Sequence, residues 1–204
     1  MTVSPVFGKL FVPSKLEEAT REILLLWFPT YLREVERQHG YPVDGLTVPL
    51  ERNYTSRNSY DAIAGEDLPR VVIICPGLMT VPLLSGDGEY RAMWRLGVGV
   101  ACVAPTEDEA KLHCDIYGAA VRGIVLKHGG KAIGGRVNWV DEQYVDLPIS
   151  EQVKQYRAGS LWFSVDIANV VSNRPKPLTP DADPYEWGTA DTVDIDLLKE
   201  PNSG

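Results

Sequence analysis

Residues 106–129 read TEDEAKLHCDIYGAAVRGIVLKHG and predict the clearest helix of the chain. Thr106 and Glu109 have the spacing of a capping box, and the acidic residues of the first turn suit the positive end of a helix dipole. Gly129 predicts that the helix stops at His128. The expected buried stripe consists of Cys114, Tyr117, Val121, Ile124 and Val125. At 1.5 Å per residue the helix is about 33 Å long, so a sheet face must receive it.

Four segments around this helix have the patterns of strands. Residues 70–75 are a β-branched run ended by Pro76, which predicts a central strand buried on both faces. Residues 90–102 alternate apolar and other side chains, with Gly97 and Gly99 at positions where a bend or a bulge is expected. Residues 133–145 and 161–171 are further candidates.

A second helix is expected near the N-terminus. Ser14 and Glu17 match a capping box, and Gly40 predicts the helix end. Pro29 interrupts the pattern, which indicates either a kink or two helices. The predicted buried stripe is Leu16, Ala19, Ile23, Trp27, Tyr31 and Val35. The resulting order predicts an α+β fold: an N-terminal helix, a mostly antiparallel sheet packed against the long mid-chain helix, and an extended C-terminal arm.

The chain divides into an extension at 1–13, one domain at 14–172 and an acidic, proline-rich arm at 173–204. The arm contains five of the 15 prolines, and seven acidic against three basic side chains. Such a composition does not form a core alone. Its apolar residues favour an arm that folds along a neighbouring subunit over a purely solvated tail. The expected contacts there are Tyr185, Trp187, Ile195, Leu197 and Leu198.

Composition excludes several classes of protein. The net charge of −8 argues against a large phosphate-binding face, which needs clustered lysine and arginine. No apolar run approaches the roughly 20 residues of a membrane span, and no secretory signal is evident, so folding in a cytoplasm is expected. The three cysteines are predicted to be buried thiols.

No residue pattern indicates catalysis. The histidines are isolated, and His39 and His128 are expected at helix ends, where they complement the dipole. The glycine clusters lack the trailing lysine of a phosphate-binding loop. We therefore expect no enzyme activity, no cofactor and no metal. An enzyme or a small-molecule binding module remains the alternative, and would need a pocket with polar groups of perturbed pKa.

The chain resembles the tail terminator, or tail-completion, proteins of long-tailed, non-contractile bacteriophages over residues 14–172. The resemblance is carried by the capped mid-chain helix with its centre AAVR at 119–122, and by RAGSLWFSVDI at 157–167, which is similar to the closing strand of these proteins. The chain departs from them by longer loops at 51–69 and 76–89 and by its C-terminal arm.

The resemblance implies a virion protein at the tail–head junction. Such a protein forms a ring, expected to be a hexamer, that caps the tail tube, stops its polymerisation and joins it to the head connector. DNA would pass through the pore without specific binding, since an acidic ring repels phosphates. The longer loops and the C-terminal arm also fit a connector or stopper on the head side, which is the less favoured alternative role.

The segment at 76–84 is the predicted docking element, because exposed apolar segments usually mark contacts. Folding back onto the protein's own core is the alternative. The residues concerned are Leu78, Met79, Val81, Leu83 and Leu84.

Overall fold

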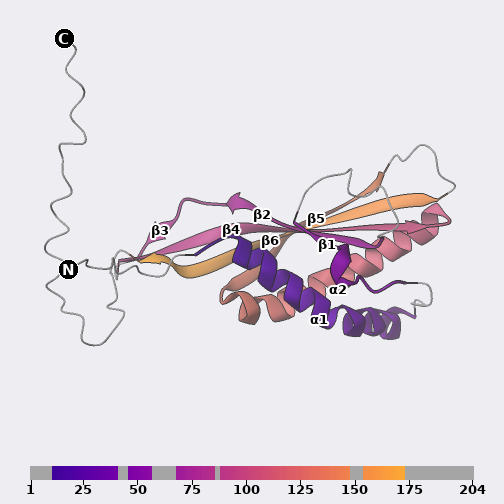
Figure 1. Cartoon of the computed structure of the whole chain (residues 1–204), viewed down its shortest axis with the longest axis horizontal. Helices are drawn as coiled ribbons and strands as arrows, with labels where there is room; N and C mark the ends of the chain where they lie inside the picture. Colours follow the sequence, from indigo (N-terminus) through magenta and orange to yellow (C-terminus); the bar gives the residue numbers. More distant parts are fainter. Residues whose placement is uncertain (1–10, 41–45, 57–67, 86–87, 148–153, 173–204) are drawn as a thin grey trace, which may run out of the picture.

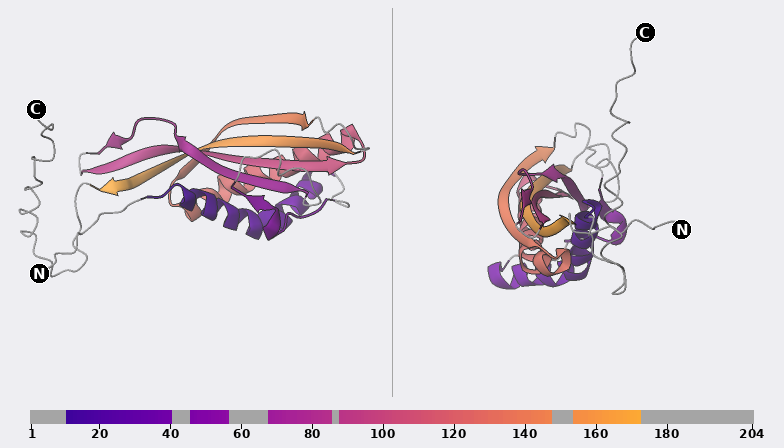
Figure 2. Two further views of the ribbon diagram at one scale, coloured as in Figure 1. Left: turned by 45° about the horizontal axis from the view of Figure 1, so that its top comes forward. Right: turned by 90° about the vertical axis from the view of Figure 1, so that its left-hand side faces the viewer.

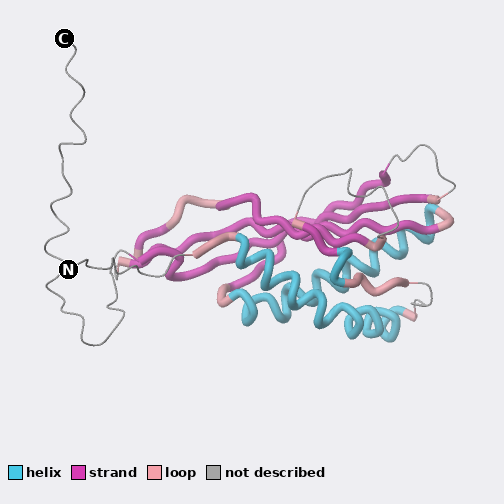
Figure 3. The backbone as a smooth tube through the Cα atoms, viewed as in Figure 1, coloured by secondary structure: helices cyan, strands magenta, loops and turns pink. Residues whose placement is uncertain are grey.

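The computed structural model describes residues 11–40, 46–56, 68–85, 88–147 and 154–172. Two long helices, α1 (Ser14–His39) and α2 (Glu107–Ile133), pack on each other and on one face of a six-stranded sheet (Figures 1 and 3). The strands are β1 (Tyr54–Thr55), β2 (Arg70–Leu78), β3 (Leu83–Leu84), β4 (Glu89–Ala104), β5 (Arg136–Leu147) and β6 (Gln155–Ser172), and a 3-10 turn spans Glu51–Asn53. The predicted α+β fold is confirmed.

The sheet has the order β1-β2-β4-β6-β5, with β3 paired to β4. The β1–β2 pair is parallel and the other pairs are antiparallel, as the predicted mostly antiparallel sheet requires. The strands twist strongly along their length (Figure 2). The central strand is β4, so the prediction that 70–75 would be central is wrong.

The expectation that β2 would be buried on both faces is also wrong. Val71 and Ile73 face the helices and are buried, whereas Val72 and Ile74 point the other way and remain partly exposed. The physical reason is that both helices lie on the same side of the sheet (Figure 1). The strand also continues past Pro76, through a bulge between Ile74 and Gly77.

The N-terminal helix begins and ends where predicted, but it is not capped as predicted. Pro13 occupies the cap position without a side-chain hydrogen bond, and Glu17 instead accepts a 2.7 Å hydrogen bond from the backbone N–H of Cys75. Gly40 ends the helix in the left-handed conformation, with φ 67°. The helix is one element that contains Pro29, so the alternative of two separate helices is wrong. The buried stripe is Leu16, Thr20, Ile23, Leu24, Phe28 and Leu32.

The mid-chain helix is longer than predicted. Thr106 caps it, accepting from the N–H of Glu109 at 3.3 Å, which confirms the predicted start. At the other end the helix runs through Gly129 to Ile133, and Gly134 is the left-handed cap, with φ 74°. Gly129 is therefore not a stop. It is buried, and a Cβ there would lie 3.3 Å from Val137, so its small size lets β5 approach the helix.

Gly135 makes the closest backbone contact of the turn between α2 and β5. A Cβ at this residue would lie 2.7 Å from the carbonyl oxygen of Asp166 on β6, a backbone atom that cannot turn aside. The N–H of Gly135 donates to the carbonyl oxygen of Gly130 at 3.2 Å, which ties the turn to the last turn of α2. Position 135 therefore has no room for a Cβ atom and requires glycine.

We predict that Gly135→Ala lowers the free energy of unfolding by about 1–3 kcal/mol, the usual cost of overpacking. Gly99→Ala is the matched control, because a Cβ there has its nearest neighbour at 3.6 Å, an ordinary contact. Its stability should stay within about 0.5 kcal/mol of the unmodified protein. Urea unfolding followed by circular dichroism measures both, and equal effects would contradict the assignment.

Candidate assembly surface

One end of the sheet extends beyond the helices and carries the five predicted docking residues. The β3 strand, the start of β4 and the end of β6 form this extension (Figures 1 and 2). We call the exposed side chains there the apolar projection: Leu78, Met79, Val81, Leu83 and Leu84. Their exposed fractions range from 38% at Met79 to 82% at Val81, so folding back onto the core is excluded.

The backbone of the projection is held even though its side chains face outward. Leu83 and Leu84 pair with Arg91 and Tyr90 of β4. The N–H of Met79 donates to the carbonyl oxygen of Met93 at 2.8 Å. The apolar side chains are thus presented on an ordered strand, which reduces the entropy that a partner must remove on binding.

An ion pair ties β4 to β6 next to the projection. The Nε of Arg91 donates to Oδ1 of Asp166 at 2.7 Å, and a second guanidinium nitrogen contacts the other carboxylate oxygen. This bidentate hydrogen bonding lowers the pKa of the Asp166 carboxyl. On the opposite face of the sheet, Phe11 packs on Trp94 with ring centroids 5.5 Å apart. The N–H of Phe11 also donates to the carbonyl oxygen of Val170 on β6 at 3.0 Å, so both strands are contacted on both faces of the sheet.

The other predicted contacts are not tested by the structure. Tyr185, Trp187, Ile195, Leu197 and Leu198 lie outside the described residues. The structure therefore brings together the five residues of the projection alone. Sequence reasoning missed a second surface, a hollow of about 300 Å³ on the sheet face opposite the helices. The glycines that intervene in the β4 alternation, Gly97 and Gly99, were its signal.

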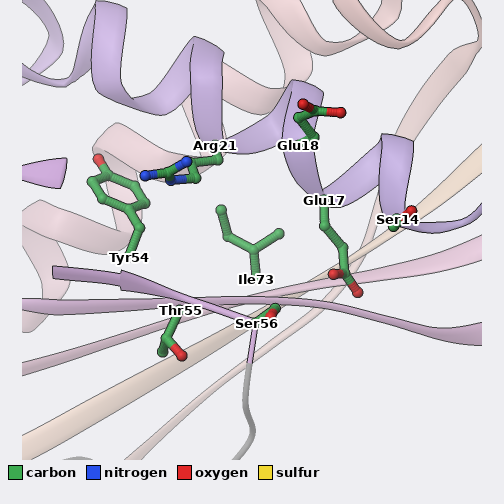
Figure 4. Close-up of a pocket in the computed structure, with 8 residues that line it drawn as sticks. All are labelled: Ser14, Glu17, Glu18, Arg21, Tyr54, Thr55, Ser56 and Ile73. Carbon is green, nitrogen blue, oxygen red and sulfur yellow. The ribbon is translucent and has the colours of Figure 1, made fainter. Parts of the chain in front are cut away.

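A pocket of about 400 Å³ lies between the start of α1, β1 and β2 (Figure 4). Its carboxylates are engaged, since Glu17 accepts from the Cys75 N–H and Glu18 contacts Lys15. Arg21 extends toward Tyr54 and pairs with Glu51 at 2.8 Å. Burial raises the pKa of the Tyr54 phenol. These contacts join α1 to β2 and to the 3-10 turn before β1.

The histidine expected at the end of the mid-chain helix has a packing role instead. His128 lies one turn before the end of α2, stacked on Trp27 with ring centroids 4.3 Å apart. Its Nε2 is 3.1 Å from the hydroxyl of Tyr31. Burial lowers the pKa of this imidazole, so the neutral ring is favoured between the helices.

The cysteines are free thiols, of which Cys102 and Cys114 are buried as predicted and Cys75 is half-buried. The pKa of Cys114 is raised by its neighbour Cys102 and by burial, which opposes the reactive thiolate form. Within the described residues, no group of three or more histidine, cysteine, aspartate and glutamate side chains could hold a metal ion. The same residues contain no helix long and apolar enough to cross a membrane.

No protein-family model and no curated protein matches the chain.

The Arg91–Asp166 pair should make stability depend on acidic pH. Because the folded-state pKa of Asp166 is depressed, the pair stabilises the fold above the ordinary aspartate pKa of about 3.9. That contribution is lost as the pH falls through the lowered folded-state pKa. Asp166→Asn should therefore lower the Tm at pH 7, and the difference from the unmodified protein should shrink at about pH 2. Arg91→Met should give the same trend in calorimetry, and a difference that does not change with pH would contradict this account.

Proposed function

We propose that the protein is a structural virion protein of a long-tailed bacteriophage that assembles into a ring. The ring caps the tail tube, stops its polymerisation and joins the tail to the head connector. The observation that carries the proposal is the apolar projection, whose five side chains are exposed on an ordered strand extension beyond the helices. A cluster of this kind marks a protein contact.

The position of the projection suits a closed ring. Subunits arranged head to tail use two different surfaces each, and an extension at one end of an elongated sheet can reach the body of the next subunit. Each fully buried leucine, valine or methionine contributes about 1.5–3 kcal/mol, so the five residues of the projection represent a substantial part of the interface energy. The ring is expected to be a hexamer.

The proposed partners follow from the same role. One face of the ring meets the last ring of the tail-tube protein and the other meets the head connector. The net charge of −8 favours passage of DNA through the pore over adhesion to it. The resemblance over residues 14–172 supports this placement.

The test compares two leucines with the same exposed fraction. Leu83 in the projection and Leu26 on α1 are both 68% exposed. We predict that Leu83→Glu abolishes the ring, giving a monomer mass by light scattering, whereas Leu26→Glu keeps the ring. Both variants should unfold at nearly the same Tm as the unmodified protein, because surface substitutions change stability by about 0.5 kcal/mol or less.

The role is tested by mixing the protein with the tail-tube protein of the same phage. Tubes of uniform length with one terminal ring in electron microscopy support the terminator. Unaltered tubes, with binding only to the head connector, would instead assign the protein to the stopper of the junction. A monomer at all concentrations, without binding to either partner, would overturn the proposal.

A further inference from the structure

The sheet face opposite the helices contains a groove built by strand register. The residues of this face stand in three transverse rows across β2, β4, β6 and β5. We call the hollow they form the sheet groove, and its rows are Ile74–Gly97–Trp162–Asp141, Val72–Gly99–Ser160–Gln143 and Arg70–Ala101–Ala158–Val145. In these rows the residues of the two central strands, β4 and β6, have small side chains apart from Trp162. The residues of the outer strands, β2 and β5, have longer side chains. The hollow therefore runs along β4 and β6.

One end of the groove is closed by an aromatic ring. Trp162 lies flat over Gly97, where an added Cβ would be 2.6 Å from the indole. The guanidinium of Arg95 stacks on the outer side of this ring, 4.2 Å from its centroid. At the other end lies Arg70, whose Nε is buried without a hydrogen-bond partner among the described residues. The groove thus has an apolar floor and an arginine at each end.

The charge of this face is opposite to that of the whole chain. The strand register places four arginines on this face, at positions 70, 91, 95 and 136. It places two aspartates there, Asp141 and Asp166. Within the described residues, no carboxylate is paired with Arg70 or Arg95. An apolar groove flanked by arginines fits an acidic peptide with large apolar side chains.

The chain itself contains such a peptide beyond the last described residue. The segment 173–204 has seven acidic and three basic side chains, a net charge of −4. Its apolar residues are concentrated after position 184 and alternate with aspartates in the run Val193-Asp194-Ile195-Asp196-Leu197. The acidic side chains of this segment thus complement the arginines of the groove, and its apolar side chains match the apolar floor.

The length of the intervening chain matches the distance to be covered. Trp162 lies ten residues before the end of β6, or about 33 Å along a strand. Residues 173–184 contain four prolines, and twelve residues of extended, proline-rich chain span about 37 Å. A chain that turns back at the end of β6 therefore brings Tyr185 and Trp187 to the Trp162 end of the groove.

We propose that residues 185–198 bind in the sheet groove of their own molecule. A short tether gives the segment an effective concentration on the order of millimolar, so weak contacts suffice for occupancy. The bound segment covers the face that the helices leave open. This assignment differs from the expectation that the arm folds along a neighbouring subunit, and it does not depend on the phage role or on ring formation.

The test measures access to a cysteine placed in the groove. Ser160 is exposed on the groove floor, and Ser160→Cys changes one atom. Maleimide labelling of this variant should become at least about tenfold faster when Tyr185→Ala, Trp187→Ala and Leu197→Ala are added. The native cysteines contribute a background, which is measured on the same chain without Ser160→Cys and subtracted. Leu84→Cys in the apolar projection is the matched control, because its labelling rate should not change with the C-terminal substitutions.

Three other outcomes would overturn the proposal. Fast labelling at position 160 in both chains means an open groove, and slow labelling in both means a different occupant, such as the same face of a second copy. Protection that disappears on dilution means that the segment or the face belongs to a second molecule.

Gln143→Cys, on the far side of the groove, repeats the measurement if Ser160→Cys does not fold. A monomeric protein with concentration-independent protection would support this inference while contradicting the proposed ring.

Discussion

The antiparallel ladder between β4 and β6 is the constraint on which the rest of the structure depends. It runs from the Glu89–Ser172 pair to the Ala104–Gln155 pair, interrupted by a single register shift near Ala92. One face of this ladder supplies Leu96, Val98, Phe163 and Val165 to the core under both helices. Because the two strands are longer than the helices that cover them, the same ladder also produces the exposed extension.

Covering the sheet from one side gives its two faces different chemistry. Side chains alternate across a strand, so the residues between the core positions of β4 and β6 point away from the helices. Glycine, alanine and serine at these positions leave a hollow rather than a smooth surface, and Trp162 with Arg95 closes one end of it. The groove and the core are thus two consequences of one pairing register.

The two surfaces suit different kinds of contact. The apolar projection is uncharged, lies at one end of the molecule and fits a neighbouring subunit of the proposed ring. The groove is bordered by arginines and lies within tether length of the acidic C-terminal segment. Cys102 and Cys114 are buried, and His128 stacks on Trp27 between the helices, where burial disfavours the charged imidazole.

The sequence by itself determined the local elements and the class of fold. The capped start at Thr106, the stop at Gly40 and the period-two pattern of β4 depend on residues a few positions apart, so they were predictable. The end of α2, the partner of Glu17 and the central position of β4 depend on contacts between distant segments, and these were predicted wrongly. The residues of the docking segment could be named from their apolar run, but their exposure could not. Only the tertiary structure decided that exposure and the existence of the groove, because both follow from which sheet face the helices cover and how far the strands extend beyond them.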